Sequence, residues 1–428
     1  MLTLKIWALE AEMATQTGYK ASELGIIPQE WKIRRIGDFT DCTAGGTPST
    51  QVSSYWGGEI PWMSSGELHL KQVYNVAGRI TQKGLENSST KFVPANSVLI
   101  GLAGQGKTRG TVAISKIPLC TNQSIAAIFP TDEFNSTFLF YNLENRYDEL
   151  RALSTGDGGR GGLNLTIIRN VSVKFPPLPE QTAIATALSD TDALISSLQT
   201  LIAKKKAIKL SAMQNLLSGK IRLPEFAQRP NGSSKTTRQT ELGCVPEDWE
   251  VVELGNVVNI FDNLRIPVTA SKRISGSTPY YGANGIQDYV EGFTHKGEFV
   301  LIAEDGANDL INYPVDYVNG EIWVNNHAHV VQGKENVLDN RFLAYRLSST
   351  NITSYLVGGT RAKLNGSTLK IIQIIIPKST DEQTAIAQLL SDMDAEIEAL
   401  EGRLKKTRSL KQGMMQALLS GKIRLPLK

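Results

Sequence analysis

Two segments of the chain carry apolar residues at the spacing of a coiled-coil seam. In the second half these residues follow a 4-3-4-3-4 spacing: Ile386, Leu390, Met393, Ile397, Leu400 and Leu404. In the first half they are separated by intervals of three, four and seven: Ile184, Leu188, Ile195, Leu198 and Ile202. This heptad pattern predicts two helices of about 37 residues, or roughly 55 Å, that pair with each other. Each segment ends at a Ser-Gly pair, so Gly219 and Gly421 are the expected C-caps.

The segments 35–178 and 250–378 show a different pattern. Short β-branched or aromatic runs alternate with Gly, Pro and Asn, which predicts two strand-rich globular domains. Strands are expected at Ser97–Leu102, Thr111–Ile117, Glu298–Ile302 and Glu321–Val324, and helices near Phe138–Leu150 and Arg341–Tyr355. The polar stretch Gln228–Gln239 predicts a linker without regular structure.

The two halves of the chain are related by an internal duplication. Residues 180–185 and 382–387 both read Glu-Gln-Thr-Ala-Ile-Ala, and residues 217–224 and 419–426 both read Leu-Ser-Gly-Lys-Ile-Arg-Leu-Pro. The globular segments share only landmarks, among them Leu163-Asn164, which matches Leu364-Asn365. Because the helical segments are nearly identical and the globular segments differ, we infer that the helices are a common scaffold that carries two different domains. A pseudo-twofold axis between the halves would pair the helices antiparallel, which predicts an α+β fold of two strand-rich domains joined by two long antiparallel coiled-coil helices.

Composition narrows the function classes. The chain has 428 residues, of which 41% are hydrophobic and 20% charged, and no apolar run approaches the roughly 18 residues of a membrane span. The segment Met1–Met13 lacks the pattern of a secretory signal, and Met13 is an alternative start. The isolated residues Cys42, Cys120 and Cys244 predict neither a disulfide framework nor a zinc site, and they favour a cytoplasmic protein. A net charge of only +3 means that any DNA contact must come from local basic clusters.

Several motifs of the chain resemble those of type I restriction-modification specificity (S) subunits. The Pro-Leu-Pro-Glu-Gln sequence at 177–181 and the two Leu-Ser-Gly-Lys-Ile-Arg-Leu endings are typical of that family's helical regions. Gly45-Gly46-Thr47-Pro48-Ser49, and Pro279-Tyr280-Tyr281-Gly282-Ala283-Asn284-Gly285 followed by Glu304-Asp305-Gly306, resemble openings of its recognition domains. The second helical region departs from the family at Pro377-Lys378-Ser379-Thr380-Asp381.

The resemblance implies a DNA reader that is non-catalytic by itself. Two target recognition domains would each read one half of a bipartite double-stranded target, and the helices would dock methyltransferase (M) and restriction (R) subunits. The chain would need no cofactor, because S-adenosylmethionine, ATP and Mg would belong to those partners, and no membrane would be involved. The candidate interface residues of the helices are Ile184, Leu188, Ile195, Leu198, Ile386, Leu390, Ile397 and Leu400.

The repeat and the resemblance together give domain boundaries. An N-terminal extension is expected over 1–17, recognition domain 1 over 18–178 and helical region 1 over 179–224. A linker over 225–239 leads to recognition domain 2 over 240–378 and helical region 2 over 379–428.

The segment Gly101–Thr108 fits the phosphate-binding pattern Gly-x4-Gly-Lys-Thr. A phosphate site of this kind also requires a helix directly after the loop, whose N–H groups hold the phosphate. The following residues, 109–114, instead read as a strand, which favours a β-hairpin that presents Lys107 and Arg109 to DNA phosphates. A nucleotide-hydrolysing enzyme built on this loop is the first alternative function, and a purely structural coiled-coil adaptor is the second.

Further candidate DNA contacts lie in polar and glycine-rich turns. Arg160 and Arg361 recur in otherwise divergent Gly-rich loops, which favours phosphate contact, and Lys363 follows the second of them. Gln123 lies in a polar turn and could read adenine. The motif at 279–285 adds Tyr280, Tyr281 and Asn284 as candidates.

Other chemistry finds little support in the sequence. A base methyltransferase needs an Asp/Asn-Pro-Pro-aromatic loop, and the Pro-Pro pair here, Pro176-Pro177, leads into a helix. The His327 and His329 pair lacks the ligand spacing of a known metal site, so no metal is expected. Basic residues on both helices, including Lys209 and Lys411, are read either as a solvated face or as contacts to DNA or a partner subunit.

Overall fold

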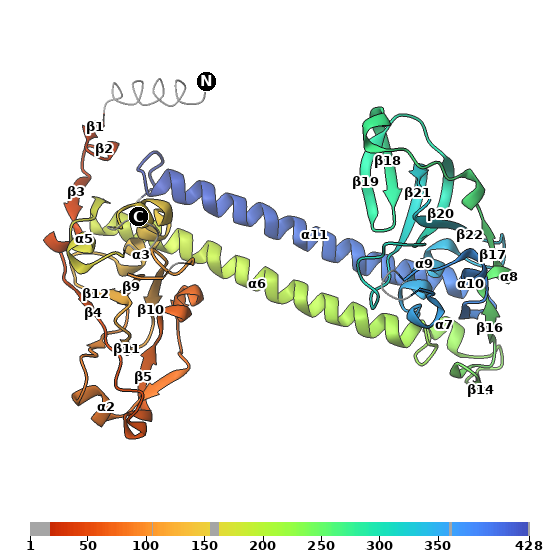
Figure 1. Ribbon diagram of the computed structural model, residues 1–428, viewed down its shortest axis with the longest axis horizontal. Helices are drawn as coiled ribbons and strands as arrows, with labels where there is room; N and C mark the ends of the chain where they lie inside the picture. The colour runs from red at the N-terminus through yellow and green to blue at the C-terminus, as the bar shows by residue number, and fades with distance from the viewer. Residues whose placement is uncertain (1–17, 105, 155–161, 359–361, 427–428) are drawn as a thin grey trace. The chain divides into compact units, whose positions relative to one another are not determined.

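The computed structural model describes residues 18–426 except 105, 155–161 and 359–361 (Figure 1). The chain divides into two compact units: unit 1 is Met1–Leu198 with Arg403–Lys428, and unit 2 is Gln199–Gly402. The long helices α6 (Leu178–Leu216) and α11 (Thr380–Leu418) have 39 residues each, close to the predicted length. Each helix therefore contributes one part to each unit.

Unit 1 contains a five-stranded and a four-stranded sheet. The first has the order β4 (Cys42–Ala44), β12 (Ile125–Ile128), β9 (Val98–Gly101), β10 (Val112–Ser115), β6 (Gln72–Val73). The second has the order β7 (Gly78–Ile80), β5 (Trp56–Met63), β11 (Leu119–Thr121), β8 (Phe92–Val93). Two strand pairs, β1 (Tyr19–Ser22) with β2 (Gly25–Pro28) and β3 (Lys32–Arg35) with β13 (Ser172–Phe175), complete the sheets. The short helices are α2 (Gln82–Glu86), α3 (Ser136–Glu144), α4 (Tyr147–Ala152) and α5 (Leu165–Arg169).

Unit 2 is built on one six-stranded sheet. Its order is β17 (Val258–Ile260), β22 (Ala328–Gly333), β20 (His295–Ala303), β21 (Val315–Val324), β18 (Ser275–Gly282), β19 (Gly285–Val290). The strands β14 (Thr237–Thr240) and β15 (Gly243–Pro246) form one further pair, and β16 (Trp249–Glu253) and β23 (Gln373–Pro377) form another. The short helices are α7 (Pro224–Ala227), α8 (Leu254–Val257), α9 (Asn340–Ser348) and α10 (Gly366–Lys370).

The structure confirms the four predicted strands and corrects three details. The helix expected near Phe138–Leu150 is two helices, because α3 ends at Glu144 and α4 begins at Tyr147. The helix expected near Arg341–Tyr355 ends at Ser348. The stretch 228–239 is not free of regular structure, because β14 begins at Thr237 and Arg229 Nη2 lies 2.7 Å from Glu247 Oε2. A polar composition did not reveal these pairings, since their partners lie further along the chain.

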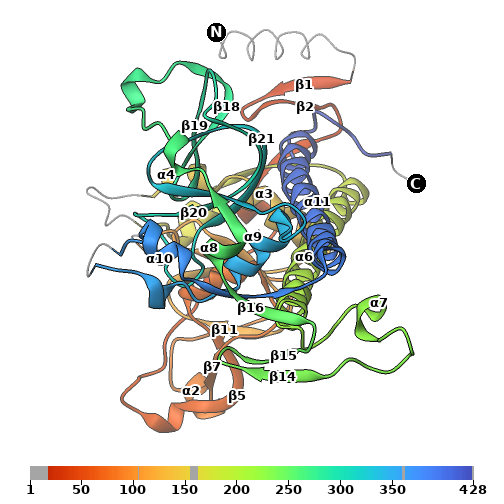
Figure 2. The same ribbon diagram turned by 90° about the vertical axis from the view of Figure 1, so that its right-hand side faces the viewer.

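The two long helices run antiparallel within each unit, as predicted, and Figure 2 shows α6 and α11 side by side. In unit 1, Lys411 Nζ lies 2.8 Å from Asp192 Oδ1, and Arg424 beyond the end of α11 reaches back to Glu180 at the start of α6. In unit 2 the matched residues do the same: Lys209 pairs with Asp394, and Arg222 with Glu382. The basic residues Lys209 and Lys411 are thus held by carboxylates rather than solvated alone.

The apolar seam is partly absorbed into the core of each unit. Ile184 and Leu188 pack with the α3 residues Phe138 and Leu139 in unit 1, while Ile386 and Leu390 pack with Phe342 and Leu343 of α9 in unit 2. Leu198 and Ile397 are also buried, and Ile195 and Leu400 are half-buried. The core of unit 1 also includes Leu418 of α11, and the core of unit 2 includes Leu216 of α6. Burial at roughly 25 cal/mol per Å² of apolar surface therefore stabilises the packing of each globular domain against both helices.

Candidate nucleic-acid interface

In unit 1, three segments that are far apart in the sequence meet beyond the end of β9. The Leu102 N–H donates to Ser124 O at 2.8 Å, and the Leu163 N–H donates to Leu102 O at 2.9 Å. These bonds join the loop after β9, the turn between β11 and β12, and the segment that leads into α5. We call the described residues of 102–108, 122–124 and 162–164 loop cluster 1.

Unit 2 repeats this frame at matched positions. The Glu304 N–H donates to His327 O at 2.8 Å, and the Leu364 N–H donates to Glu304 O at 2.7 Å. The loop after β20, the turn between β21 and β22, and the segment before α10 are therefore joined as in unit 1. Residues 304–312, 325–327 and 362–365 form loop cluster 2. The repeated Leu-Asn landmarks of the sequence mark this shared frame.

Lys107 is exposed in a hairpin loop of cluster 1, whereas Arg109 is buried. Strands β9 and β10 are antiparallel and pair Ile100 with Val112 across the loop. Helix α4 braces it, because Tyr147 Oη donates to Lys107 O at 3.2 Å and Arg151 Nη1 donates to Gly106 O at 2.6 Å. A strand follows the loop where a phosphate site needs a helix, so the nucleotide-binding alternative is not supported.

Gln123 is tied to the loop that carries the Gly-Gly-Thr-Pro-Ser motif. Thr47 Oγ1 donates to Gln123 Oε1 at 2.6 Å, and Trp62 Nε1 donates to Gly46 O at 2.9 Å. A Cβ at Gly45 would lie 2.0 Å from Thr121 O, so only glycine permits this approach. The motif therefore positions the turn that presents Gln123.

Asn284 and Lys363 lie at loops that converge, Lys363 within cluster 2 and Asn284 on the hairpin beside it. Asn284 occupies the tip of the β18–β19 hairpin, where its Nδ2 donates to Gly306 O and its Oδ1 accepts from the Asn308 N–H, both at 2.9 Å. Lys363 Nζ lies 2.9 Å from Glu304 Oε1, and its side chain is 42% exposed. Both residues hold the cluster together from its exposed side.

The two tyrosines of the same motif do not both reach the surface. Tyr280 is 1% exposed, its hydroxyl accepts from the Val268 N–H at 3.0 Å, and Arg273 lies over its ring at 4.1 Å. Tyr281 is half-buried against the apolar cluster on one face of the sheet. A DNA contact by Tyr280 is therefore incompatible with its burial. Arg160 and Arg361 lie outside the described residues.

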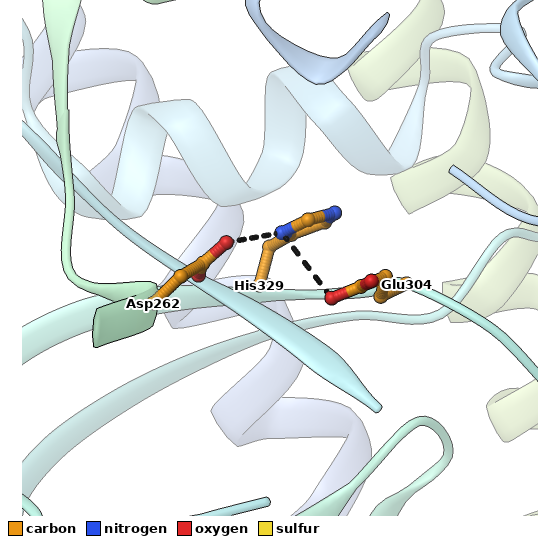
Figure 3. A group of neighbouring side chains, drawn as sticks. All are labelled: Asp262, Glu304 and His329. Carbon is orange, nitrogen blue, oxygen red and sulfur yellow. Dashed lines mark hydrogen bonds and ion pairs between the residues drawn. The ribbon is translucent and has the colours of Figure 1, made fainter. Parts of the chain in front are cut away.

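A buried ionic group underlies loop cluster 2 (Figure 3). His329 Nδ1 lies 2.6 Å from Asp262 Oδ2 and 3.8 Å from Glu304 Oε2, and its Nε2 lies 2.8 Å from Leu364 O. Burial acts to raise the pKa of Asp262, but the hydrogen bond and charge of His329 outweigh it and hold that pKa below its usual value. No motif in the sequence marked this group, because Asp262 follows β17 and His329 lies near the start of β22, 67 residues further along the chain.

This group has the donor types of a metal site, yet its charges are already balanced. Arg265 Nη1 lies 2.7 Å from Glu304 Oε2, and Lys363 holds the other Glu304 oxygen. A cation would have to displace both positive side chains. The arrangement is better suited to fixing the loop after β20 than to binding a metal.

Comparison with known proteins places the chain in a family. A family profile described as "Type I restriction modification DNA specificity domain" matches residues 28–207 and 246–407, one match in each half of the duplication. The chain therefore belongs to the type I restriction-modification DNA specificity family. No helix in the described part of the chain is long and apolar enough to cross a membrane.

Individual relatives agree with this assignment. The type I restriction enzyme MjaIX specificity subunit of Methanocaldococcus jannaschii is 26% identical over 96% of this chain and 97% of its own length. A putative type I restriction enzyme specificity subunit of Haemophilus influenzae is 51% identical over 35% of this chain and 37% of its own length. The crystal structure of a type I S subunit from M. genitalium has the same fold, with a TM-score of 0.61 at 17% identity over 91% of this chain and 96% of that one.

Proposed function

We propose that the chain is a non-catalytic DNA reader in which loop clusters 1 and 2 each contact one half of a bipartite target. The observation that carries this proposal is one backbone frame bearing different side chains. The same pairs of hydrogen bonds build both clusters, yet cluster 1 presents Lys107 and Gln123, while cluster 2 presents Lys363 together with Asn284 of the adjoining hairpin. A constant frame with variable side chains suits two domains that dock alike on DNA and read different bases.

Catalysis then belongs to the partner subunits. Methyl transfer from S-adenosylmethionine would be performed by M subunits, and ATP- and Mg-dependent cleavage by R subunits docked on the same assembly. The chain's own Pro176-Pro177 pair lies directly before α6 and cannot form the loop that holds a flipped base. The exposed side chains of α6 and α11, among them Ile208 at 45% and Leu410 at 60%, are the surface offered to M subunits.

A domain exchange tests whether each globular domain reads one half-site. Residues 240–378 are replaced by the corresponding segment of a relative, the chain is assembled with its M subunits, and methylated sites are mapped by long-read sequencing. One half-site should change and the other should stay. A single continuous target, or a change in both half-sites, would contradict the two-reader proposal, and absence of any DNA preference would favour a structural adaptor.

A further inference from the structure

Unit 2 has a polar recess beside loop cluster 2. It is lined by the hairpin tip at Asn284, by Asn308 and Asn312 of the loop after β20, and by Asp316 at the start of β21, and its volume is about 660 Å³. The Asp316 Oδ2 atom faces the hairpin tip, since it lies 3.7 Å from the position that a Cβ on Gly285 would take. The recess therefore opens where the proposed DNA contacts of unit 2 converge.

The Asp316 carboxylate is unpartnered among the residues that the structure describes. Within the described part of the chain, no side chain donates a hydrogen bond to it and no cation pairs with it, whereas Asp309 on the same rim accepts from the Ile311 and Asn312 N–H groups. Burial raises the pKa of Asp316, so the charged form is kept at a cost in stability. A half-buried carboxylate without a donor is poised to accept one from outside the chain.

The duplication shows that the scaffold does not need this carboxylate. In unit 2, β20 pairs Leu301 with Asp316, and in unit 1, β9 pairs Leu99 with Ala113 at the matched position. Ala113 is fully buried in an apolar cluster. The same place in the frame thus holds a methyl group in one reader and an acceptor in the other.

The neighbouring loop is shaped for contact. The Asp309 carboxylate bonds fix a tight turn that leaves Ile311 89% exposed and Leu310 43% exposed beside the recess. Exposed apolar side chains at a loop tip favour contact with base edges such as a thymine methyl group rather than with phosphate. A carboxylate is likewise repelled by phosphate, so the chemistry of the recess selects base edges.

We propose that Asp316 is a specificity-determining residue of unit 2, which accepts a hydrogen bond from the exocyclic amino group of a cytosine or an adenine in the half-site of that unit. These amino groups are the donors that cytosine and adenine present in the major groove. The inference rests on the proposed function and extends it to one base position.

The first experiment maps methylation by the complete complex carrying Asp316→Asn or Asp316→Ala. Both variants should relax or change one base of the half-site that the domain exchange assigns to unit 2, and leave the other half-site intact. Glu321→Gln is the matched control, because Glu321 is an exposed carboxylate on the same strand and already has a partner, Lys296. If the Asp316 variants keep the wild-type motif, the inference is wrong while the two-reader proposal stands; if the wild-type complex has no bipartite motif, the proposed function itself fails.

The second experiment does not depend on activity of the variants. Binding of the assembled complex is measured on targets in which each cytosine or adenine of that half-site is replaced in turn by an analogue without the amino group. One analogue should weaken wild-type binding roughly 5- to 150-fold, and the Asp316→Ala complex should be insensitive at that position. Equal sensitivity of both complexes at every position, or no sensitivity of the wild type, would overturn the inference.

Discussion

The junctions between domain and helices are alike in the two units, whereas the loop clusters differ. Trp31 Nε1 donates to Glu180 at 2.9 Å in unit 1, and Trp249 Nε1 donates to Glu382 at 3.2 Å in unit 2. Tyr141 donates to Asp192, and Tyr345 to Asp394, both at 2.7 Å. The two loop clusters, in contrast, share backbone hydrogen bonds but differ in most of their side chains. The two halves of the chain thus share the side chains that fix each domain to the helices and differ in the side chains of the loop clusters.

The two junctions differ in burial, and this difference predicts the largest effect. The Arg222 side chain is 8% exposed between Glu382 and Asp248, while Arg424 is 36% exposed beside Glu180 and Glu30. Arg222→Ala leaves carboxylates without their buried partner and should lower the free energy of unfolding by about 3 kcal/mol. Arg424→Ala should cost about half as much, because water reaches the vacated space.

Chemical denaturation with hydrogen exchange resolved by unit measures both losses. Lys296→Ala serves as the control, since the Lys296–Glu321 pair is 68% and 44% exposed and such pairs contribute at most about 1 kcal/mol. Equal losses for Arg222→Ala and Arg424→Ala would mean that the difference in burial has no energetic consequence.

Lowering the pH should destabilise the two loop clusters to different extents. The pKa values of Asp262 and Glu304 are lowered in the folded chain by their bonds to His329, Arg265 and Lys363, against the effect of burial. A carboxyl group with a lowered pKa stabilises the fold above its unfolded pKa of about 4, and this stability is lost as pH falls through the folded pKa. Cluster 2 should therefore loosen as pH falls below about 4, before cluster 1 does.

Hydrogen exchange of the Val330 amide, which donates to Asp262 Oδ1 at 2.9 Å, reports this loss. In Asp262→Asn the protection should be lower at neutral pH and nearly independent of pH in the acid range. A wild-type protection that stays constant through this range would show that the buried ionic group does not hold cluster 2.

The smallest expected effect concerns the two lysines of the clusters. Lys107 is exposed, whereas Lys363 pairs with Glu304. Lys107→Ala should make the log-salt dependence of DNA binding shallower by about one unit, as loss of one phosphate contact requires, and Lys363→Ala should change it less. ATP hydrolysis by the full complex should be unchanged in Lys107→Ala, and loss of hydrolysis with DNA binding preserved would revive the nucleotide-binding alternative.

The sequence alone predicted the long helices, their C-caps, the duplication and the two strand-rich domains. These features depend on local periodicity and on direct repetition, and both can be recognised from the order of the residues alone. Gly219 and Gly421 adopt positive φ angles of 71° and 78°, as their place after a helix predicts. The family resemblance and the hairpin at Gly101–Thr108 could be inferred for the same reason.

Only the tertiary structure decided which residues of the candidate interface are available. Tyr280 and Arg109 are buried, and Tyr280 lies against Arg273 and the Val268 backbone. Asp316 reaches the recess from β21, which pairs with β20. The sequence also did not predict which segments form each unit. In unit 1, for example, Tyr19 Oη donates to Gly421 O at 3.2 Å, although the two residues are 402 positions apart. Burial and pairing of this kind depend on contacts between segments that are distant in the chain, and the local sequence does not determine which distant segment packs against it.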